Sequence, residues 1–391
     1  MQSGIAFVVP FGLGEKTTVW ARTLPLAQEL VRAGHRGTIV IPPWDTPDDA
    51  GVTETREGVD LINVSLTGGL LPTLRRMVRI IQEREPEIVH VVKPRAHAGL
   101  IQWWLWQRRR LTGRGPRLLL DIDDWEQAWA SINHYTPPVA RFLAWQEEWG
   151  IRHADGITAA SRWLTNRAQE YAPTTPRCYV PNGVPHQAMH SDHATPDSGA
   201  ATYSILYYTR FVEISPQWLT DFWRAMRASE PDAHLHVAGS ALIAGREREF
   251  QHHLAAADAD AAAAVTWHGF VDGPTQEALY AAADCAIFPA RAEPLQEAKC
   301  SVRLATTLLH GVPVVASAVG EQANYGGDGA AQLLPADATP AEFAADVLAL
   351  LRNPAHAQAM TALARDRLHN QYAWHVLGHK LVDFYADILH P

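Results

Sequence analysis

The chain has 391 residues, with 33 Lys and Arg against 42 Asp and Glu and a formal net charge of −9. Hydrophobic residues make up 47% of it and charged residues 19%, which is typical of a globular protein and excludes a disordered or collagen-like one. A protein that coats nucleic acid needs an excess of cations, so we expect no nucleic-acid partner. At about 150 residues per domain, the length predicts two domains.

The cysteines and the apolar runs indicate the compartment. Cys178, Cys285 and Cys300 are far apart and form no CxxC pair, so we expect a reducing compartment. No stretch approaches the roughly 18 uncharged apolar residues of a transmembrane helix. The first apolar run, 5–10, is short and fits a buried strand better than a secretory signal. We therefore expect a cytoplasmic protein, with a peripheral position on the inner face of the membrane as the alternative.

Short apolar runs alternate with longer amphipathic segments through the first half of the chain. Residues 19–33 and 70–84 have helical spacing, and they stop at Gly34 and before Pro86. The runs that indicate buried strands are 5–9, 38–41, 61–64, 88–92, 118–122, 156–159 and 178–180. This alternation predicts a parallel sheet covered by helices on both faces.

The alternation is interrupted once and then restarts. Residues 181–202 are rich in Pro, Asn, Gly, Ser, His and Asp and have no sustained period, which is typical of a linker. Strands are then expected at 203–208, 233–238, 265–268, 285–288 and 312–317. Helices are expected at 218–229, 247–264, 276–283, 302–310, 339–352, 355–371 and 376–389.

We therefore predict an α/β protein with two Rossmann-like, doubly wound parallel-sheet domains facing a central cleft. The expected boundaries are 1–184 for the N-terminal domain, 185–202 for the linker and 203–375 for the C-terminal domain. Such sheets bind ligands at the carboxyl ends of their strands, beside helix N-termini. A nucleotide or another phosphate-bearing ligand is the expected occupant.

A glycine-containing loop follows the first strand. Gly12 and Gly14 let the backbone approach a ligand closely, and the helix start that follows favours an anion. A P-loop would need Gly next to Lys, but Glu15 stands between Gly14 and Lys16. We prefer a loop that faces the cleft, and a plain tight turn remains the alternative.

Three aspartates mark the end of the strand at 118–122. Asp121, Asp123 and Asp124 precede Trp125, and clustered oxygens of this kind suit a hard cation. A metal site is therefore one interpretation, and capping of the next helix is another. We prefer a carboxylate cluster that faces the cleft without a metal.

A group of cations and histidines follows the strand at 88–92. Lys93, Arg95 and His97 lie within eight residues that begin at His90. A lone histidine is usually structural, but this density at a strand end predicts that His97 lines the cleft.

A tryptophan-rich segment leads into a run of arginines. Trp103, Trp104 and Trp106 precede Arg108, Arg109 and Arg110, with Arg117 at the end of the segment. Tryptophan beside arginine on a helix suits an anionic lipid surface, so the segment from Trp103 to Arg117 is a candidate membrane contact. A core helix with a solvated basic end is the alternative.

Three strand ends in the second half carry residues suited to a ligand. Arg210 offers a bidentate partner for a diphosphate, and Gly239 and Gly269 permit a close approach of the backbone. Ser240 and Phe270 follow these two glycines directly.

Taken together, the segments resemble the retaining, nucleotide-sugar-dependent glycosyltransferases of family 4, which have the B-type fold. The motifs that carry the resemblance span nearly the whole chain: 12–16, 87–90, 153–161, 180–184, 209–211, 265–271, 283–289, 311–320 and 372–374. The resemblance implies that the donor binds mainly to the C-terminal domain. It also implies that the last helix, 376–391, packs back onto the N-terminal domain.

The resemblance also implies roles for single residues. Arg210 matches the residue that contacts the donor diphosphate, and the backbone of Phe270 and Val271 matches the segment at the base. Glu293 matches the residue at the donor-sugar hydroxyls. His97 lies near the family's acceptor-side histidine.

The chain departs from the family at two positions. Ser215 stands where the family has a lysine five residues after the arginine, and Thr306 stands where it has the second glutamate, which usually holds the ribose. Lys299 or Arg303 is the expected replacement for the missing cation.

The predicted function is transfer of a sugar from a nucleotide-sugar donor to a glycan, lipid-linked or small-molecule acceptor, with retention and without metal or other cofactor. The alternatives are a catalytically degraded nucleotide-sugar-binding protein and a sugar-nucleotide epimerase of the same fold. The predicted site comprises His97, Glu293 and Asp123 as catalytic residues; Arg210, Lys299, Arg303, Gly239, Ser240, Gly269, Phe270, Val271, Gly12 and Gly14 at the donor; and Glu15, Lys16, Lys93, Asp124 and Trp125 on the acceptor side.

Overall fold

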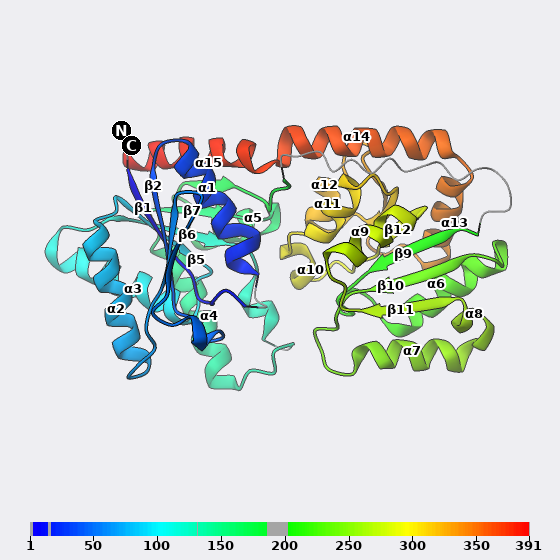
Figure 1. The fold of residues 1–391 in the computed structure, drawn as a ribbon, viewed down its shortest axis with the longest axis horizontal. Helices are drawn as coiled ribbons and strands as arrows, with labels where there is room; N and C mark the ends of the chain where they lie inside the picture. The colour runs from blue at the N-terminus through cyan, green and yellow to red at the C-terminus, as the bar shows by residue number, and fades with distance from the viewer. Residues whose placement is uncertain (1–2, 15–16, 131, 186–201, 391) are drawn as a thin grey trace. The chain divides into compact units, whose positions relative to one another are not determined.

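The computed structural model describes residues 3–14, 17–130, 132–185 and 202–390 (Figure 1). The chain divides into two compact units. The first comprises Met1–Gly183, Ala298–Cys300 and Tyr372–Pro391, and the second comprises Val184–Glu297 and Ser301–Gln371. Almost all of the predicted linker, 185–202, lies outside the described residues.

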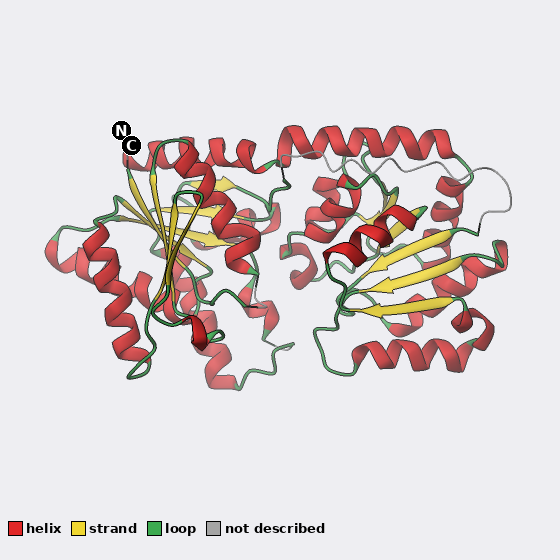
Figure 2. Cartoon of the chain, viewed as in Figure 1, coloured by secondary structure: helices red, strands yellow, loops and turns green. Residues whose placement is uncertain are grey.

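The first unit is built on an eight-stranded sheet in the order β3-β4-β2-β1-β5-β6-β7-β8 (Figure 2). Its strands are β1 Gly4–Val8, β2 Arg36–Ile41, β3 Thr53–Arg56, β4 Val59–Asn63, β5 Ile88–Val92, β6 Arg117–Ile122, β7 Gly156–Ala159 and β8 Arg177–Tyr179. All neighbours pair in parallel except β3, which is antiparallel to β4. The predicted parallel sheet is confirmed, and β3 is an unpredicted addition at its edge.

Helices connect these strands in the order of the chain. They are the π-helix η1 Val19–Thr23, α1 Leu24–Arg32, the 3-10 helix η2 Pro47–Asp49, α2 Leu70–Arg84, α3 Ala96–Thr112, the 3-10 helix η3 Glu126–Trp129, α4 Pro137–Arg152, α5 Arg162–Tyr171 and α15 Trp374–Leu389. The segment predicted as one helix over 19–33 is thus a π-helical turn that continues into α1. The last helix, α15, packs against α1 and β8.

The second unit has a six-stranded parallel sheet in the order β11-β10-β9-β12-β13-β14. Its strands are β9 Ser204–Tyr208, β10 His234–Ala238, β11 Val265–Gly269, β12 Cys285–Phe288, β13 Val314–Ser317 and β14 Gln332–Leu334. Its helices are α6 Pro216–Ser229, α7 Arg246–Ala257, α8 Ala259–Ala263, α9 Gly273–Ala282, α10 Pro294–Ala298, α11 Val302–Leu309, α12 Gly320–Tyr325, α13 Pro340–Leu351 and α14 Pro354–Tyr372.

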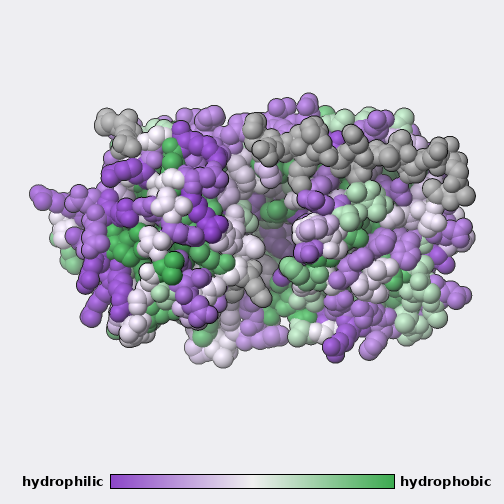
Figure 3. Space-filling model, viewed as in Figure 1, coloured by the Kyte–Doolittle hydropathy of each residue, from purple (hydrophilic) through white to green (hydrophobic). Residues whose placement is uncertain are grey.

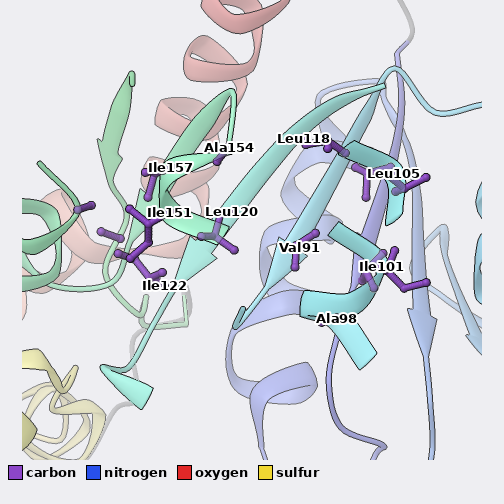
Figure 4. Close-up of a cluster of buried hydrophobic side chains, with 14 of the residues drawn as sticks. Val91, Ala98, Ile101, Leu105, Leu118, Leu120, Ile122, Ile151, Ala154 and Ile157 are labelled. Carbon is purple, nitrogen blue, oxygen red and sulfur yellow. The ribbon is translucent and has the colours of Figure 1, made fainter. Parts of the chain in front are cut away.

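Both faces of the first sheet are covered by apolar packing. On one face, Leu118, Leu120 and Ile122 of β6 pack with Ile101 and Leu105 of α3 (Figure 4). Side chains alternate along a strand, so the same β6 sends Leu119 to the other face, where it joins residues of α1 and α15. The rigid sheet positions the polar residues that follow its carboxyl ends.

Neither the surface drawn in Figure 3 nor any described helix has a long apolar stretch. On the face drawn in Figure 3, hydrophilic side chains predominate and hydrophobic ones occur in small groups. Within the described part of the chain, no helix is both long enough and apolar enough to cross a bilayer.

Candidate functional site

In the second unit, a buried carboxylate organises the loop after β9. Glu213 accepts hydrogen bonds from the Thr209 hydroxyl at 2.9 Å and from the backbone N–H of Val212 at 3.0 Å. Its other oxygen lies 2.7 Å from Nη2 of Arg303, on α11. The loop turns sharply at Phe211, whose φ is 61°. Glu213 therefore holds the backbone around Arg210 in a fixed shape.

The guanidinium group of Arg303, on α11, lies near that of Arg210 in this loop. Arg303 donates from Nη1 to the carbonyl of Tyr208 at 3.2 Å, and its Cζ is 5.6 Å from the centre of the Tyr208 ring. Burial lowers the pKa of the half-buried Arg210, and the charge of Arg303 lowers it further. Among the residues that the structure describes, the Arg210 side chain makes no salt bridge. Because Glu213 compensates the charge of Arg303, Arg210 is the cation of this region that is suited to bind an anionic group.

The ends of β10 and β11 approach this loop closely. Gly239 has a φ of 114°, and a Cβ at this position would come within 2.0 Å of the carbonyl oxygen of Thr209. Its N–H donates to the carbonyl of Gly269 at 2.7 Å. Phe270 then stands 81% exposed, while the next residue, Val271, is buried. A glycine is required at 239 because two strand-end backbones meet there.

A small cavity of about 200 Å³ lies beside the ends of β12 and β13. Ser215, Arg291 and Ser317 are among its lining residues. Ser215 caps α6 by accepting from the N–H of Trp218 at 3.2 Å. A short side chain at this position thus serves the helix start, and Arg303 supplies the cation beside Arg210.

Glu293 and Ser240 lie on the surface of the second unit. Glu293 is exposed, and Oε1 of its carboxylate is 3.2 Å from Nε of Arg291, just before α10. Ser240 directly follows Gly239 and is half-buried. Thr306 lies on α11, one turn after Arg303.

The first unit carries a charged cluster at the carboxyl ends of β5 and β6. Nζ of the buried Lys93 lies 3.2 Å from Asp123, 2.5 Å from Asp124 and 3.8 Å from Glu126. Arg95 forms an ion pair with Glu126 and donates to the Tyr135 hydroxyl at 2.7 Å. The structure therefore brings together three of the predicted residues, Lys93, Asp123 and Asp124.

Two carboxyl groups of this region have strongly displaced pKa values. Burial raises the pKa of Asp123; Lys93 lowers it, but Asp124 and Asp121 help to hold it at about 7. Burial and the charge of Glu126 raise the pKa of Glu147 to about 8. Burial alone would lower the pKa of Lys93, but the surrounding carboxylates raise it above its ordinary value.

Asp121 belongs to a separate, fully buried network. It forms two hydrogen bonds of 2.6 Å with Arg22 and accepts from the Thr158 hydroxyl at 2.5 Å. Because Thr158 gives its hydrogen to Asp121, His90 Nε2 must donate to Thr158 at 3.0 Å, and His90 Nδ1 accepts from Tyr385 on α15 at 2.5 Å. Burial lowers the pKa of His90 to about 4, so the imidazole is neutral. This network ties η1, β5, β6, β7 and α15 together.

His97 lies in the first turn of α3 and is half-buried. Burial lowers its pKa. Its Nδ1 is buried and has no hydrogen-bond partner within the described chain. A neutral imidazole with an unused nitrogen is suited to a substrate hydroxyl.

The glycines of the first loop have a structural explanation. The N–H of Gly12 donates to the carboxylate of Asp45 at 2.6 Å, and an added Cβ would come within 2.3 Å of the Thr46 hydroxyl. A Cβ at Gly14 would come within 2.7 Å of the same threonine. The predicted acceptor-side residues Glu15 and Lys16 lie outside the described residues.

Two other predicted residues pack inside the first unit. Trp125 is 7% exposed, and its ring centre lies 5.9 Å from those of Trp163 and Tyr171. Lys299, predicted at the donor, is counted with the first unit, and its Nζ lies 5.7 Å from the centre of the Trp129 ring. Sequence reasoning missed Arg22 and Glu147, whose partners are distant in the chain, and Glu213, whose ion-pair partner Arg303 is 90 residues away.

Comparison with known proteins agrees with this architecture. Residues 202–353 match the family model described as glycosyl transferases group 1, and residues 17–183 match the glycosyl transferase 4-like domain. No curated protein sequence matches the chain.

Solved structures extend the likeness over nearly the whole chain. Sucrose-phosphate synthase from Thermosynechococcus elongatus is 18% identical, with a TM-score of 0.71 and 99% of each chain covered. A glycosyltransferase from Rickettsia africae is 16% identical, with a TM-score of 0.68 over 100% of this chain and 99% of that one. HepE of Anabaena, in complex with UDP-glucose, is 14% identical, with a TM-score of 0.67 over 99% and 100%.

Two parallel-sheet units with polar residues at their strand ends are the architecture of GT-B enzymes. The family matches make the assignment definite: the chain is a glycosyltransferase of the GT-B type and belongs to the group 1 glycosyl transferases.

Proposed function

We propose that the protein transfers a sugar from a nucleotide-sugar donor, with retention and without a metal, to a glycan, lipid-linked or small-molecule acceptor. The observation that carries the proposal is the pair of guanidinium groups, Arg210 and Arg303, beside the glycine-lined ends of β10 and β11. The complexes of HepE with UDP and UDP-glucose support a donor of this class.

In this mechanism the bond between the anomeric carbon and the donor diphosphate breaks as the bond to the acceptor oxygen forms. Negative charge grows on the departing diphosphate, and cations already aimed at it lower the barrier most effectively. Arg210, with Arg303 next to it, fills this role. Retention is expected from the family resemblance.

The acceptor is proposed to bind at the strand ends of the first unit. Asp123, with a pKa of about 7, is suited to take the proton from the acceptor hydroxyl near neutral pH. Lys93 and Asp124 fix its position, and His97 offers a neutral nitrogen to a sugar hydroxyl. Glu293, being exposed, is available to the donor sugar.

We also propose a peripheral contact with an anionic membrane. The surface proposed here differs in part from the segment Trp103–Arg117 that the sequence suggested. Trp106 packs against the rings of Trp149 and His153, at 5.6 and 4.8 Å, and Arg109 forms an ion pair with Asp155, so these two residues hold the fold. The exposed rings are Trp104 on α3, and Phe142 and Trp145, which stack at 5.9 Å on the neighbouring α4. We name these three side chains the aromatic surface.

The test of the main proposal is a screen of nucleotide sugars by thermal shift, followed by turnover with a panel of acceptors in EDTA. Transfer that persists in EDTA supports the proposal. Strict dependence on Mg²⁺ would instead favour a metal at Asp123 and Asp124.

The replacement of the second glutamate by Thr306 favours one alternative, a degraded protein that only binds nucleotide sugars. Binding without turnover for any acceptor would establish it. Product formation without an acceptor would indicate an epimerase.

A further inference from the structure

A cavity of about 300 Å³ lies in the first unit, at the amino ends of β1 and β2. In a parallel sheet this edge is opposite the one that carries Lys93 and Asp123. Its lining includes His35, Arg36 and Thr38. The proposed transfer reaction uses none of these residues.

Small side chains on one face of the sheet create the cavity. The register pairs Gly4 with Arg36, Ala6 with Thr38 and Thr38 with Asp60, so these residues form rows on the same face. Gly4 and Ala6 fill little of that space. A Cβ added at Gly4 would lie 3.4 Å from Nη2 of Arg36, so the guanidinium lies over this glycine.

The cavity has an excess of positive charge. Arg84, in the last turn of α2, is paired with Asp60 at 2.9 Å, so the lining carboxylate is already neutralised. Arg36 is exposed and forms no salt bridge with any residue that the structure describes. Among the described lining residues, the guanidinium of Arg36 therefore has no paired carboxylate.

A second, independent observation comes from His35. Its Nδ1 is buried and has no hydrogen-bond partner in the described ranges. Buried polar atoms in proteins are usually hydrogen-bonded, so an unpartnered nitrogen next to this cavity calls for an explanation such as a water molecule or an ion. The hydroxyl of Thr38 lines the same space.

We propose that this cavity binds a small phosphate-bearing anion. Arg36 supplies the uncompensated charge, and its guanidinium and the Thr38 hydroxyl supply hydrogen bonds to the phosphate oxygens. The volume is at the lower end of the roughly 300–1,000 Å³ of ligand pockets, so it suits inorganic phosphate or a monosaccharide phosphate better than a nucleotide sugar. The site is a second one, on the unit that does not carry Arg210.

The experiment is isothermal titration of the full chain with inorganic phosphate, a hexose 6-phosphate and the uncharged hexose. All proteins carry Arg210→Ala, so that phosphate binding at the proposed donor site does not contribute. Arg36→Gln is compared with Arg32→Gln, which removes the same charge from an exposed residue of α1 outside the cavity lining. Thr38→Val removes only a hydroxyl, and circular dichroism checks that each variant folds.

We expect phosphate to bind the Arg210→Ala protein that serves as the parent. Arg36→Gln and Thr38→Val should each weaken the affinity for phosphate by about tenfold, while Arg32→Gln should change this affinity by less than about twofold. Tighter binding of the hexose phosphate identifies a sugar phosphate as the ligand, and equal binding identifies the phosphate group alone. No binding to the parent, or equal weakening by Arg36→Gln and Arg32→Gln, would overturn the proposal. Because Arg210 is absent throughout, either result leaves the proposed transfer reaction untouched.

Discussion

Nη2 of Arg303 lies 2.7 Å from Oε1 of Glu213, and this ion pair joins α11 to the loop after β9 in the second unit. The pair leaves Glu213 as the centre of a turn that also holds the Thr209 hydroxyl and the backbone N–H of Val212. A cation on α11 therefore shapes the loop of Arg210 and also adds positive potential beside it.

Removal of the unpaired cation is the most direct test of this arrangement. We expect Arg210→Ala to reduce turnover by about 100-fold, because the departing diphosphate loses its charged partner. Arg246→Ala is the matched control, since Arg246 pairs with the exposed Glu249 at the surface of α7. The measurement is the steady-state rate of each variant with the same donor. Similar rates for the two variants would refute the proposal that Arg210 binds the donor diphosphate.

The rate of transfer should follow the ionisation of Asp123. With a pKa of about 7, its carboxyl is protonated below neutral pH and cannot accept the acceptor proton. We expect kcat/KM to rise with pH until about 7 and then to level off. Asp123→Asn should lower kcat/KM by about 100-fold and remove this rise. A pH profile that keeps its shape in Asp123→Asn would assign the titration to another group.

Glu147 should make the fold less stable as the pH rises. Its pKa is about 8 in the folded chain, above an unfolded value of about 4.3, so the folded state binds an extra proton between these values. The free energy of unfolding should therefore fall between about pH 5 and 8. Urea denaturation should show a smaller fall in Glu147→Gln.

The matched control for this prediction is Glu148→Gln. Its carboxylate is partly exposed and pairs with Arg152 one turn later on α4, so it should leave the pH dependence as it is in the unmodified chain. An identical pH dependence for all three proteins would show that the proton is bound elsewhere.

The aromatic surface should bind anionic vesicles. Exposed tryptophans insert at the lipid headgroups, so we expect Trp104→Ala/Trp145→Ala to lose most of the binding to phosphatidylglycerol vesicles in a flotation assay. Both side chains are about half exposed, and the fold should tolerate the change. Trp44→Ala provides a control with an equally exposed tryptophan on another segment. Equal flotation of all variants would contradict the membrane contact.

The sequence was sufficient to predict most of the two sheets, because their strands are short apolar runs between helices of clear period. It did not reveal α4, because Gln146 and Glu147 occupy buried positions and break the apolar period of that helix. Strand β3 also escaped prediction, since its residues are polar and mostly exposed on a sheet edge.

The site was predicted in part, and the reason lies in distance along the chain. Arg210, Lys93 and Asp123 follow apolar strands, so their place at strand ends could be inferred. The partners Glu213 and Arg303 are 90 residues apart, and Arg22 and Asp121 are 99 apart, and no local pattern links such pairs. Neighbouring aspartates consequently looked alike, although Asp121 joins a buried network and Asp123 lies beside Lys93.

The close approach at Gly239 limits how the enzyme could be redesigned. Any side chain there would push against the carbonyl of Thr209 and separate the two loops beside the proposed phosphate-binding residue Arg210. A mutant library aimed at a different donor would do better to diversify Phe270, whose side chain is exposed although it directly follows Gly269, and to leave Gly239 unchanged.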